Sequence, residues 1–218
     1  MRVLTEYCSL VFDCDGVVLN SNHVKTEAFY QAALPYGEAA AQALVDYHVA
    51  NGGISRYRKF EYLLGQILGL PKNSEALDAL LAHYAALVHD GLRSCAIAPG
   101  LHELRAQLPD ANWLIVSGGD QEELREVFAV RGLAALFDGG IYGSPDAKDM
   151  ILARELERGN IRMPALFLGD SRFDHQCATA AGIDFVFLSS WSEFKGWPEY
   201  FSANPVAVRE SLGTLMAE

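Results

Sequence analysis

Three short apolar runs along this chain end in polar residues, and this arrangement limits the possible folds more than any other feature. The runs have the length and the β-branched or aromatic content of buried strands, and helical patterns separate most of them. They cover residues 7–12, 113–116 and 165–168, and they are followed by Asp13, Ser117 and Gly169-Asp170. Strands that alternate with helices predict a parallel sheet with helices on both faces.

Two weaker runs extend this sheet. Residues 140–142 precede a Gly-Ser-Pro turn, and residues 184–188 are predicted to form the last strand before an irregular tail. The expected fold is therefore α/β, a doubly wound parallel sheet of the Rossmann-like type. In such sheets ligands bind at the carboxyl edge, where residues distant in sequence converge. Asp13, Ser117 and Asp170 are predicted to meet there.

The segment of residues 22–96 has a different character. It is rich in Ala, Leu, Tyr and His at helical spacing and has no convincing alternating pattern of a strand. It leaves the core after the first strand, and the chain returns to the core at Pro99-Gly100. We therefore predict an inserted α-helical cap of residues 22–96 and a core domain of residues 1–21 and 97–218.

The charge of the chain limits its partners. It carries 17 basic and 28 acidic residues, a formal net charge of −11 that is spread along the sequence. Such a surface gives no attraction for nucleic acid, so an anionic substrate needs local positive charge or a metal. No signal peptide is recognisable, and no stretch approaches the roughly 20 apolar residues of a membrane span. We expect a cytoplasmic protein with no nucleic-acid and no membrane partner.

The sequence Asp13-Cys14-Asp15-Gly16 places two carboxylates directly after a buried strand. Buried carboxylates need partners, and Mg²⁺ prefers oxygen ligands, taking one or two carboxylates together with substrate phosphate. Asp13 and Asp170 suit this ion, and Gly16 allows a sharp turn behind the pair. The alternative for such a motif is a solvated turn, because Asp and Gly are ordinary turn residues.

The ordered set of motifs is more specific than any one of them. The set consists of FDCDGVVLNS, IVSGG, GSPDAKD and FLGDSRFDHQCATAAG. Together with the long insert, it resembles the haloacid dehalogenase superfamily of phosphohydrolases, in the cap-bearing branch that includes phosphoglycolate phosphatases and β-phosphoglucomutase. The resemblance implies a nucleophile at Asp13, a general acid and base at Asp15, a phosphoryl-binding Ser117, a charge-balancing Lys148, and metal ligands at Asp13, Asp15, Asp170 and Asp174.

The chemistry explains why these residue types are needed. A carboxylate that attacks a phosphate dianion is repelled, by about 4 kcal/mol for two unit charges about 4 Å apart at a dielectric near 20. Mg²⁺ and Lys148 supply compensating charge, and Ser117 with the Gly118 amide donates to the transferring oxygens. Asp15 has to donate a proton and later accept one, so we expect its neighbours to raise its pKa.

The cap contains one dense polar loop around Gly52-Gly53, in the sequence HVANGGISRYRKFEYLL. We predict that this loop closes over the core and presents Arg56 and Lys59 to an anionic substrate. The alternative is a solvated turn between helices whose charges face water.

The sequence favours a phosphatase acting on a small phosphorylated metabolite, with a phosphosugar as one candidate. The alternatives are a phosphomutase or phosphonate-cleaving enzyme on the same scaffold, and a non-enzymatic phospho-accepting regulatory domain. Many mutases of this superfamily carry a histidine twelve residues after the nucleophile, where this chain has Lys25, which disfavours isomerisation. The oligomeric state is not predictable from the sequence.

Overall fold

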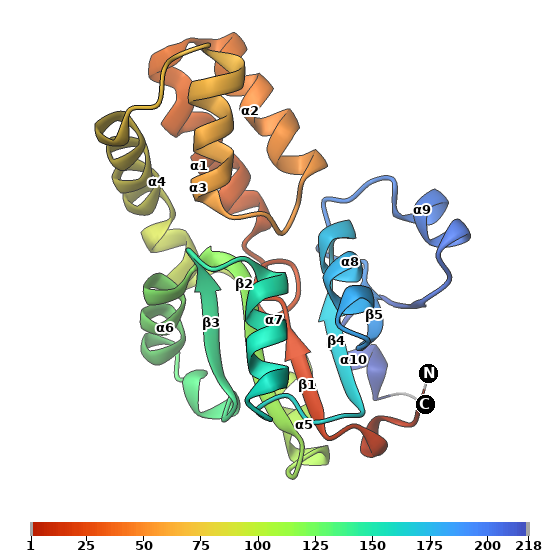
Figure 1. Cartoon of the computed structure of the whole chain (residues 1–218). Coiled ribbons are helices and arrows are strands. Elements are labelled where there is room, and N and C mark those ends of the chain that lie inside the picture. Colours follow the sequence, from red (N-terminus) through yellow and green to blue (C-terminus); the bar gives the residue numbers. More distant parts are fainter. Residues whose placement is uncertain (1, 217–218) are drawn as a thin grey trace.

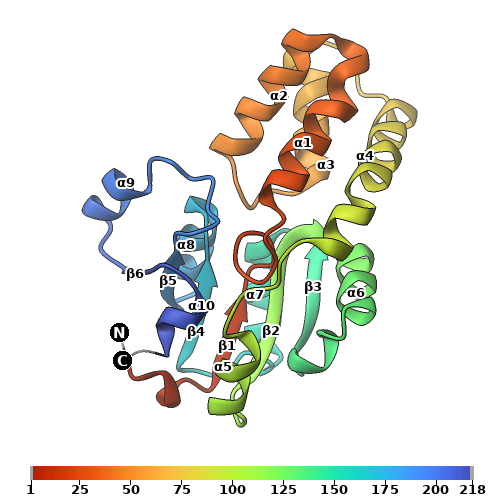
Figure 2. The ribbon, with the colours of Figure 1, turned by 180° about the vertical axis from the view of Figure 1, so that it is seen from behind.

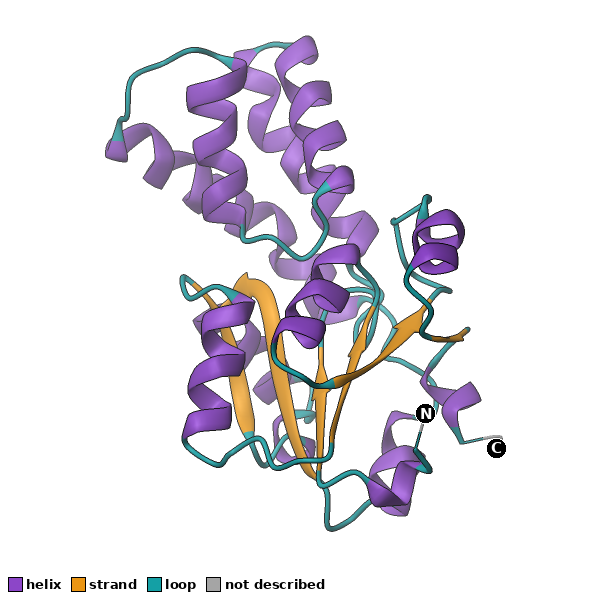
Figure 3. Ribbon diagram, turned by 45° about the vertical axis from the view of Figure 1, so that its right-hand side comes forward, coloured by secondary structure: helices purple, strands orange, loops and turns teal. Residues whose placement is uncertain are grey.

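A six-stranded parallel sheet forms the centre of the computed structural model, which describes residues 2–216 (Figure 3). The strands lie in the order β3-β2-β1-β4-β5-β6, so the chain winds outward from β1 in both directions. Their bounds are β1 Ser9–Phe12, β2 Asn112–Asp120, β3 Gly140–Ser144, β4 Ala165–Gly169, β5 Asp184–Leu188 and β6 Ala207–Arg209. The predicted doubly wound α/β fold is confirmed, and its switch point lies between β1 and β4.

Two details of the sheet differ from the prediction. β2 continues through Ser117 to Asp120, beyond the predicted run of residues 113–116, with a register shift against β3 after Val116. β6 pairs with β5 in the region that was predicted to be an irregular tail. A three-residue edge strand that is only half-buried carries too few apolar residues to be recognised from sequence.

Helices cover both faces of the sheet because strand side chains alternate in direction. Leu10 and Phe12 point into one apolar core, and Val11 points into the other. The first core is covered by α5 (Leu101–Gln107), α6 (Gln121–Val130) and α10 (Leu212–Leu215), as Figure 2 shows. The second is covered by α7 (Lys148–Glu157), α8 (Arg172–Ala180) and α9 (Trp197–Ala203). Burial on both faces explains why the strands are almost wholly apolar.

Four helices lie beyond the carboxyl ends of the strands (Figure 1). They are α1 (Asn22–Ala33), α2 (Glu38–Ala50), α3 (Arg56–Tyr62) and α4 (Ser74–Ser94), and they pack around the rings of Phe29, Phe60 and Tyr84. Short 3-10 helices occupy Leu4–Glu6, Leu34–Tyr36 and Ala134–Leu136, and a π-helix over Leu63–Ile67 follows α3. We keep the name cap for residues 22–96; that they form a separate domain stays a prediction.

The two segments that join the cap to the core lie side by side. The Asn20 amide donates to the Ala96 carbonyl, and the Ala98 amide donates to the Val18 carbonyl, both at 2.9 Å. Any movement of the cap therefore bends both connections together. Within residues 2–216, no helix is long and apolar enough to cross a membrane.

Candidate active site

Asp13 lies at the carboxyl end of β1, in the middle of the sheet. Its backbone N–H donates to the Leu168 carbonyl of β4 at 2.9 Å, which places it beside Asp170. Its side chain is only 4% exposed, and its Oδ2 lies 2.8 Å from the Nζ of Lys148, the first residue of α7. Three sequence motifs thus meet at one edge of the sheet.

Three carboxylates gather around this point. Asp13, Asp170 and Asp174 are all buried, and one oxygen of each lies within 4.8 Å of the others. Burial raises the pKa of Asp13 to about 7. The charge of Lys148 opposes this increase, and the charges of Asp174 and Asp15 add to it. Burial and the charge of Asp13 raise the pKa of Asp170 well above its ordinary value. Lys148 offsets only part of this negative charge, so a set of hard oxygen donors with excess charge remains, and it fits Mg²⁺.

Gly16 is required for the cluster to form. Its φ is +74°, and a Cβ at this position would lie 2.1 Å from an oxygen of Asp170. Any other residue would be strained in the turn and would displace a carboxylate of the cluster.

Asp174 has two structural roles, one toward Lys148 and one at the start of α8. Its Oδ1 lies 2.5 Å from Lys148 Nζ. Its Oδ2 accepts from the amide and the hydroxyl of Ser171, at 3.1 and 2.6 Å, in a capping box at the start of α8. It therefore orients Lys148 and caps α8, and its role as a metal ligand stays a prediction.

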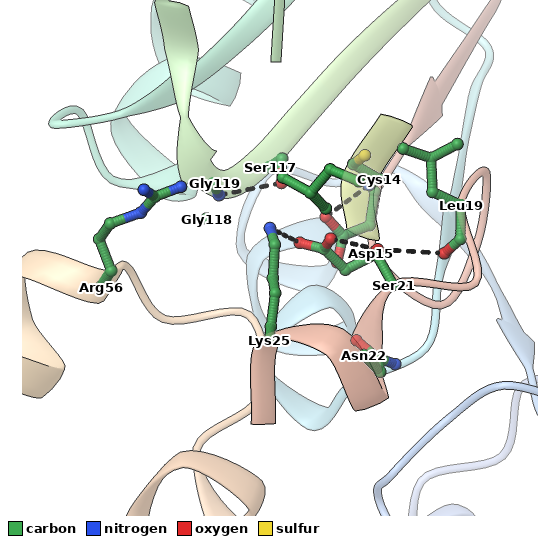
Figure 4. A network of polar contacts seen from close by, with 12 residues as sticks. Cys14, Asp15, Leu19, Ser21, Asn22, Lys25, Arg56, Ser117, Gly118 and Gly119 are labelled. Carbon is green, nitrogen blue, oxygen red and sulfur yellow. Dashed lines mark hydrogen bonds and ion pairs between the residues drawn. The ribbon is translucent and has the colours of Figure 1, made fainter. Parts of the chain in front are cut away.

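Asp15 does not belong to the acidic cluster and has partners of its own. Its Oδ2 lies 2.5 Å from Lys25 Nζ, and its Oδ1 accepts from the Ser21 hydroxyl at 2.5 Å (Figure 4). Burial raises its pKa, but the charge and hydrogen bond of Lys25 and the bond from Ser21 outweigh burial, so the pKa is lowered. The prediction of a raised pKa was wrong, because it counted only acidic neighbours. The carboxylate of Asp15 lies outside the cluster of Asp13, Asp170 and Asp174, and its role as a metal ligand stays a prediction.

Sequence reasoning missed the residues at the start of α1. Asn22 donates to Asp170 Oδ2 at 2.7 Å and to the Trp191 carbonyl at 2.9 Å. Ser21 and Lys25 both bind Asp15, and they stand four positions apart, the spacing that places two side chains on one helix face. The four-residue spacing of Ser21 and Lys25, shortly after the DxDG motif, was the sequence signal that could have identified them.

The segment Ser117-Gly118-Gly119 lies at the end of β2, across from Asp15 in Figure 4. Ser117 is fully buried, and its Oγ accepts from the Gly119 amide at 3.0 Å. Gly118 is in tight contact with the cap: a Cβ there would lie 2.3 Å from the carbonyl oxygen of Gly53. The polar loop of the cap thus rests on this segment, as predicted for a closing loop.

A cavity of about 250 Å³ lies between core and cap. Its lining includes Asp13, Asp170 and Gly118 from the core and Asn51, Gly53 and Lys59 from the cap. The lining does not include Lys148, Asp174 or Ser117, so these three predicted site residues lie behind the cavity wall.

Arg56 and Lys59 both line the cavity, and both are buried, so the alternative of a solvated turn is wrong for them. Both terminal nitrogens of Arg56 donate to the carboxylate of Glu123 in α6, which neutralises its charge. Lys59 Nζ lies 2.6 Å from His48 Nδ1. Burial and the charge of Lys25 lower the pKa of Lys59 to about 7.

Solved structures share this fold. A haloacid dehalogenase-like family hydrolase of Streptococcus pneumoniae is 21% identical, with a TM-score of 0.71 over 98% of this chain and 99% of that one. A predicted phosphoglycolate phosphatase of Haemophilus somnus is 15% identical, with a TM-score of 0.73 over 98% of both chains. A phosphonoacetaldehyde hydrolase-like protein of Oleispira antarctica is 15% identical, with a TM-score of 0.73 over 100% of this chain and 92% of that one.

These likenesses establish the fold, and the family rests on the sequence. A comparison with curated proteins gives no match. Residues 10–188, from β1 to the end of β5, match the family model of haloacid dehalogenase-like hydrolases. The family predicted from the motifs is confirmed: this chain belongs to the haloacid dehalogenase-like hydrolases and is a hydrolytic enzyme.

Proposed function

We propose that this hydrolase is a magnesium-dependent phosphatase that cleaves a small phosphomonoester through an aspartyl phosphate on Asp13. The observation that carries the proposal is the contact of Asp13 with Lys148 beside a buried acidic cluster, in the wall of a cavity that the cap covers. A cavity of about 250 Å³ suits a metabolite and excludes a macromolecular substrate. A phosphosugar is one candidate.

In the first step an oxygen of Asp13 attacks phosphorus, and the bond from phosphorus to the leaving oxygen breaks. Lys148, buried against Asp13 and Asp174, keeps a positive charge beside the nucleophile. Mg²⁺, held by Asp13 and Asp170 with Asp174 nearby, would supply the remaining charge compensation for the phosphoryl oxygens. The amide of Gly118, which lines the cavity, would donate to the same oxygens.

The proton that the leaving oxygen needs comes from the buried pair of Lys25 and Asp15. In the free enzyme this pair holds one proton on Lys25 and keeps Asp15 ionised. In the second step water attacks phosphorus and the bond from phosphorus to the Asp13 oxygen breaks, which releases phosphate and restores Asp13. Asp15 accepts the proton of the water, so the pair of Asp15 and Lys25 again holds one proton. Asp15 is ionised before this step, so it is in the form that can accept the proton.

The direct test is phosphate release from a panel of sugar phosphates, nucleotides and an aryl phosphate, with and without Mg²⁺. We expect release that needs Mg²⁺ and is lost in Asp13→Asn. Asp78→Asn is the matched control, because Asp78 is exposed on α4. Release that is equal in Asp13→Asn and the wild type contradicts the proposal.

Cleavage of a carbon–phosphorus bond is the second candidate, and one observation favours it. Lys59 is a buried amine in the cavity wall with a pKa of about 7, and such an amine can form a Schiff base with a carbonyl substrate. Borohydride reduction in the presence of phosphonoacetaldehyde would then attach the substrate to Lys59. The intact Asp15 favours ester hydrolysis, whose leaving oxygen needs a proton.

A phospho-accepting regulatory domain would instead keep its aspartyl phosphate without turnover. The cytoplasmic location and the absence of nucleic-acid and membrane partners stay predictions.

A further inference from the structure

The buried cations around the cavity differ in their partners. Lys25 pairs with Asp15, Arg56 pairs with Glu123, and Lys148 pairs with Asp13 and Asp174. Lys59 is just as buried, 2% exposed, and lines the same cavity, yet within residues 2–216 it forms no salt bridge. Its hydrogen-bond partner is a ring nitrogen of His48.

A chain of hydrogen bonds fixes that partner. The Thr26 hydroxyl donates to the carboxylate of Glu193, at 2.8 and 3.1 Å from its two oxygens, so its oxygen is free to accept from His48 Nε2 at 3.0 Å. His48 then carries its proton on Nε2 and accepts from Lys59 at Nδ1, 2.6 Å away. Burial and the charge of Lys59 lower the pKa of His48 well below its ordinary value, which agrees with a neutral ring. One N–H of Lys59 is thereby fixed, and its other protons remain for a ligand.

The surroundings of Lys59 leave its positive charge poorly compensated. The positive charges of Lys25 in α1 and Lys148 in α7 disfavour a protonated Lys59. The carboxylates of Asp15 and Glu193 favour protonation, but both are too far away to form a salt bridge with Lys59. His48 of α2 contributes a neutral acceptor. A buried amine without an acidic partner is costly to protonate, and an anion placed beside it would remove that cost.

We propose that Lys59 and His48 form a subsite of the cavity that binds a carboxylate on the leaving-group part of the substrate. The inference rests on the proposed function, because it takes the reacting phosphate to lie at Asp13. The carboxylate would accept from Lys59 while His48 holds the amine in place. A substrate with both groups bridges the core and the cap, and this selects phosphorylated hydroxy acids over phosphorylated alcohols.

The kinetic test compares 2-phosphoglycolate with ethylene glycol monophosphate, which carries a hydroxyl in place of the carboxylate. We expect the wild type to prefer 2-phosphoglycolate at least tenfold in kcat/KM. Lys59→Met should lose about 10- to 100-fold with 2-phosphoglycolate and less than about threefold with the alcohol ester, as for a lost hydrogen bond to a charged group. Lys72→Met is the matched control, because Lys72 is exposed on the cap.

The binding test does not depend on turnover. Calorimetry in the presence of Mg²⁺, in two buffers of different ionisation heat, compares both esters on Asp13→Asn and on Asp13→Asn with Lys59→Met. We expect 2-phosphoglycolate to take up an additional fraction of a proton near pH 7.5, relative to ethylene glycol monophosphate, and this excess to vanish without Lys59. Loss of packing alone would not change proton uptake.

Each outcome decides one proposal. If Lys59→Met changes neither the preference nor the proton uptake, the carboxylate subsite is wrong, while Mg²⁺-dependent hydrolysis of the alcohol ester still supports the phosphatase. If the wild type hydrolyses no ester, the proposed function fails, and the calorimetric excess still decides whether Lys59 binds a carboxylate.

Discussion

Lys25 forms a buried ion pair with Asp15, with 2.5 Å between Nζ and Oδ2. Lys25 lies on α1, the first helix of the cap, and Asp15 lies on the core loop that follows Asp13, so the pair links the position of the cap to the charge of Asp15. It also explains why Asp15 is ionised in the free enzyme. We expect this pair, rather than Asp15 alone, to control the proton transfers.

Replacing Lys25 by Met should raise the pKa of Asp15, because the charge that opposes its burial is lost. Above the folded pKa Asp15 is ionised and serves as base, so the acidic limb of the kcat profile should move to higher pH. Removing one partner of a buried pair also costs about 3–5 kcal/mol of stability. The measurement is the pH profile with an aryl phosphate; Lys25→Arg keeps the charge and serves as control. An unmoved acidic limb in Lys25→Met would contradict the account.

Gly118→Ala should hold the cap away from the core, because its Cβ would meet the Gly53 carbonyl at 2.3 Å. We expect kcat/KM to fall at least tenfold, with little change in the melting temperature. Gly65→Ala is the matched control in the cap, where a Cβ meets nothing within 4 Å. Unchanged kinetics in Gly118→Ala would mean that this contact does not matter for turnover.

Glu123→Gln should destabilise the folded protein, because Arg56 would keep a buried charge without a charged partner. The side chains of Arg56 and Glu123 are 6% and 17% exposed, so we expect a loss of about 1–3 kcal/mol in the free energy of unfolding. Glu126→Gln is the comparison, because Glu126 pairs with Arg93 at the surface, where the two side chains are 60% and 31% exposed. Surface pairs of this kind contribute about 0–1 kcal/mol to the free energy of unfolding. Urea denaturation of both variants measures the difference, and equal losses would refute the argument.

Lys59→Met should stabilise the ligand-free protein near pH 7. Burial lowers the pKa of Lys59 from 10.5 to about 7, so the unfolded state binds more protons on this lysine between these values. Wild-type stability therefore rises with pH through this window. The variant also loses the hydrogen bond to His48, which reduces the gain. We expect its free energy of unfolding to exceed that of the wild type by about 1–3 kcal/mol at pH 7, and the difference to disappear near pH 10.5. Thermal melts against Lys72→Met measure it; a gain independent of pH would show that only packing changed.

The sequence predicted well what depends on local pattern and on the geometry of parallel sheets. Asp13 and Asp170 follow apolar runs, and neighbouring parallel strands end at one edge, so their meeting was predictable. Lys148 was placed by the resemblance of its motif and by its position at the start of a helix.

Contacts that depend on helix packing were not predictable. The direction of Asp15 depends on where α1 begins and which face it turns to the core, and Lys25 was noted only as a departure from a family pattern. His48 and Lys59 lie eleven positions apart on different helices, and their contact depends on how α2 and α3 pack. Glu193, more than 130 positions later in the chain, is linked to His48 through the hydroxyl of Thr26.

The most direct test of the account is to trap the phosphoryl group on the protein. Asp15→Asn removes the base of the second step, so acid quenching of this variant with substrate and Mg²⁺ should give the peptide that contains Asp13 carrying one phosphoryl group. The wild type should show it only transiently, and Asp13→Asn should not show it. A phosphoryl group on another residue, or none on any variant while the wild type releases phosphate, would contradict nucleophilic catalysis by Asp13.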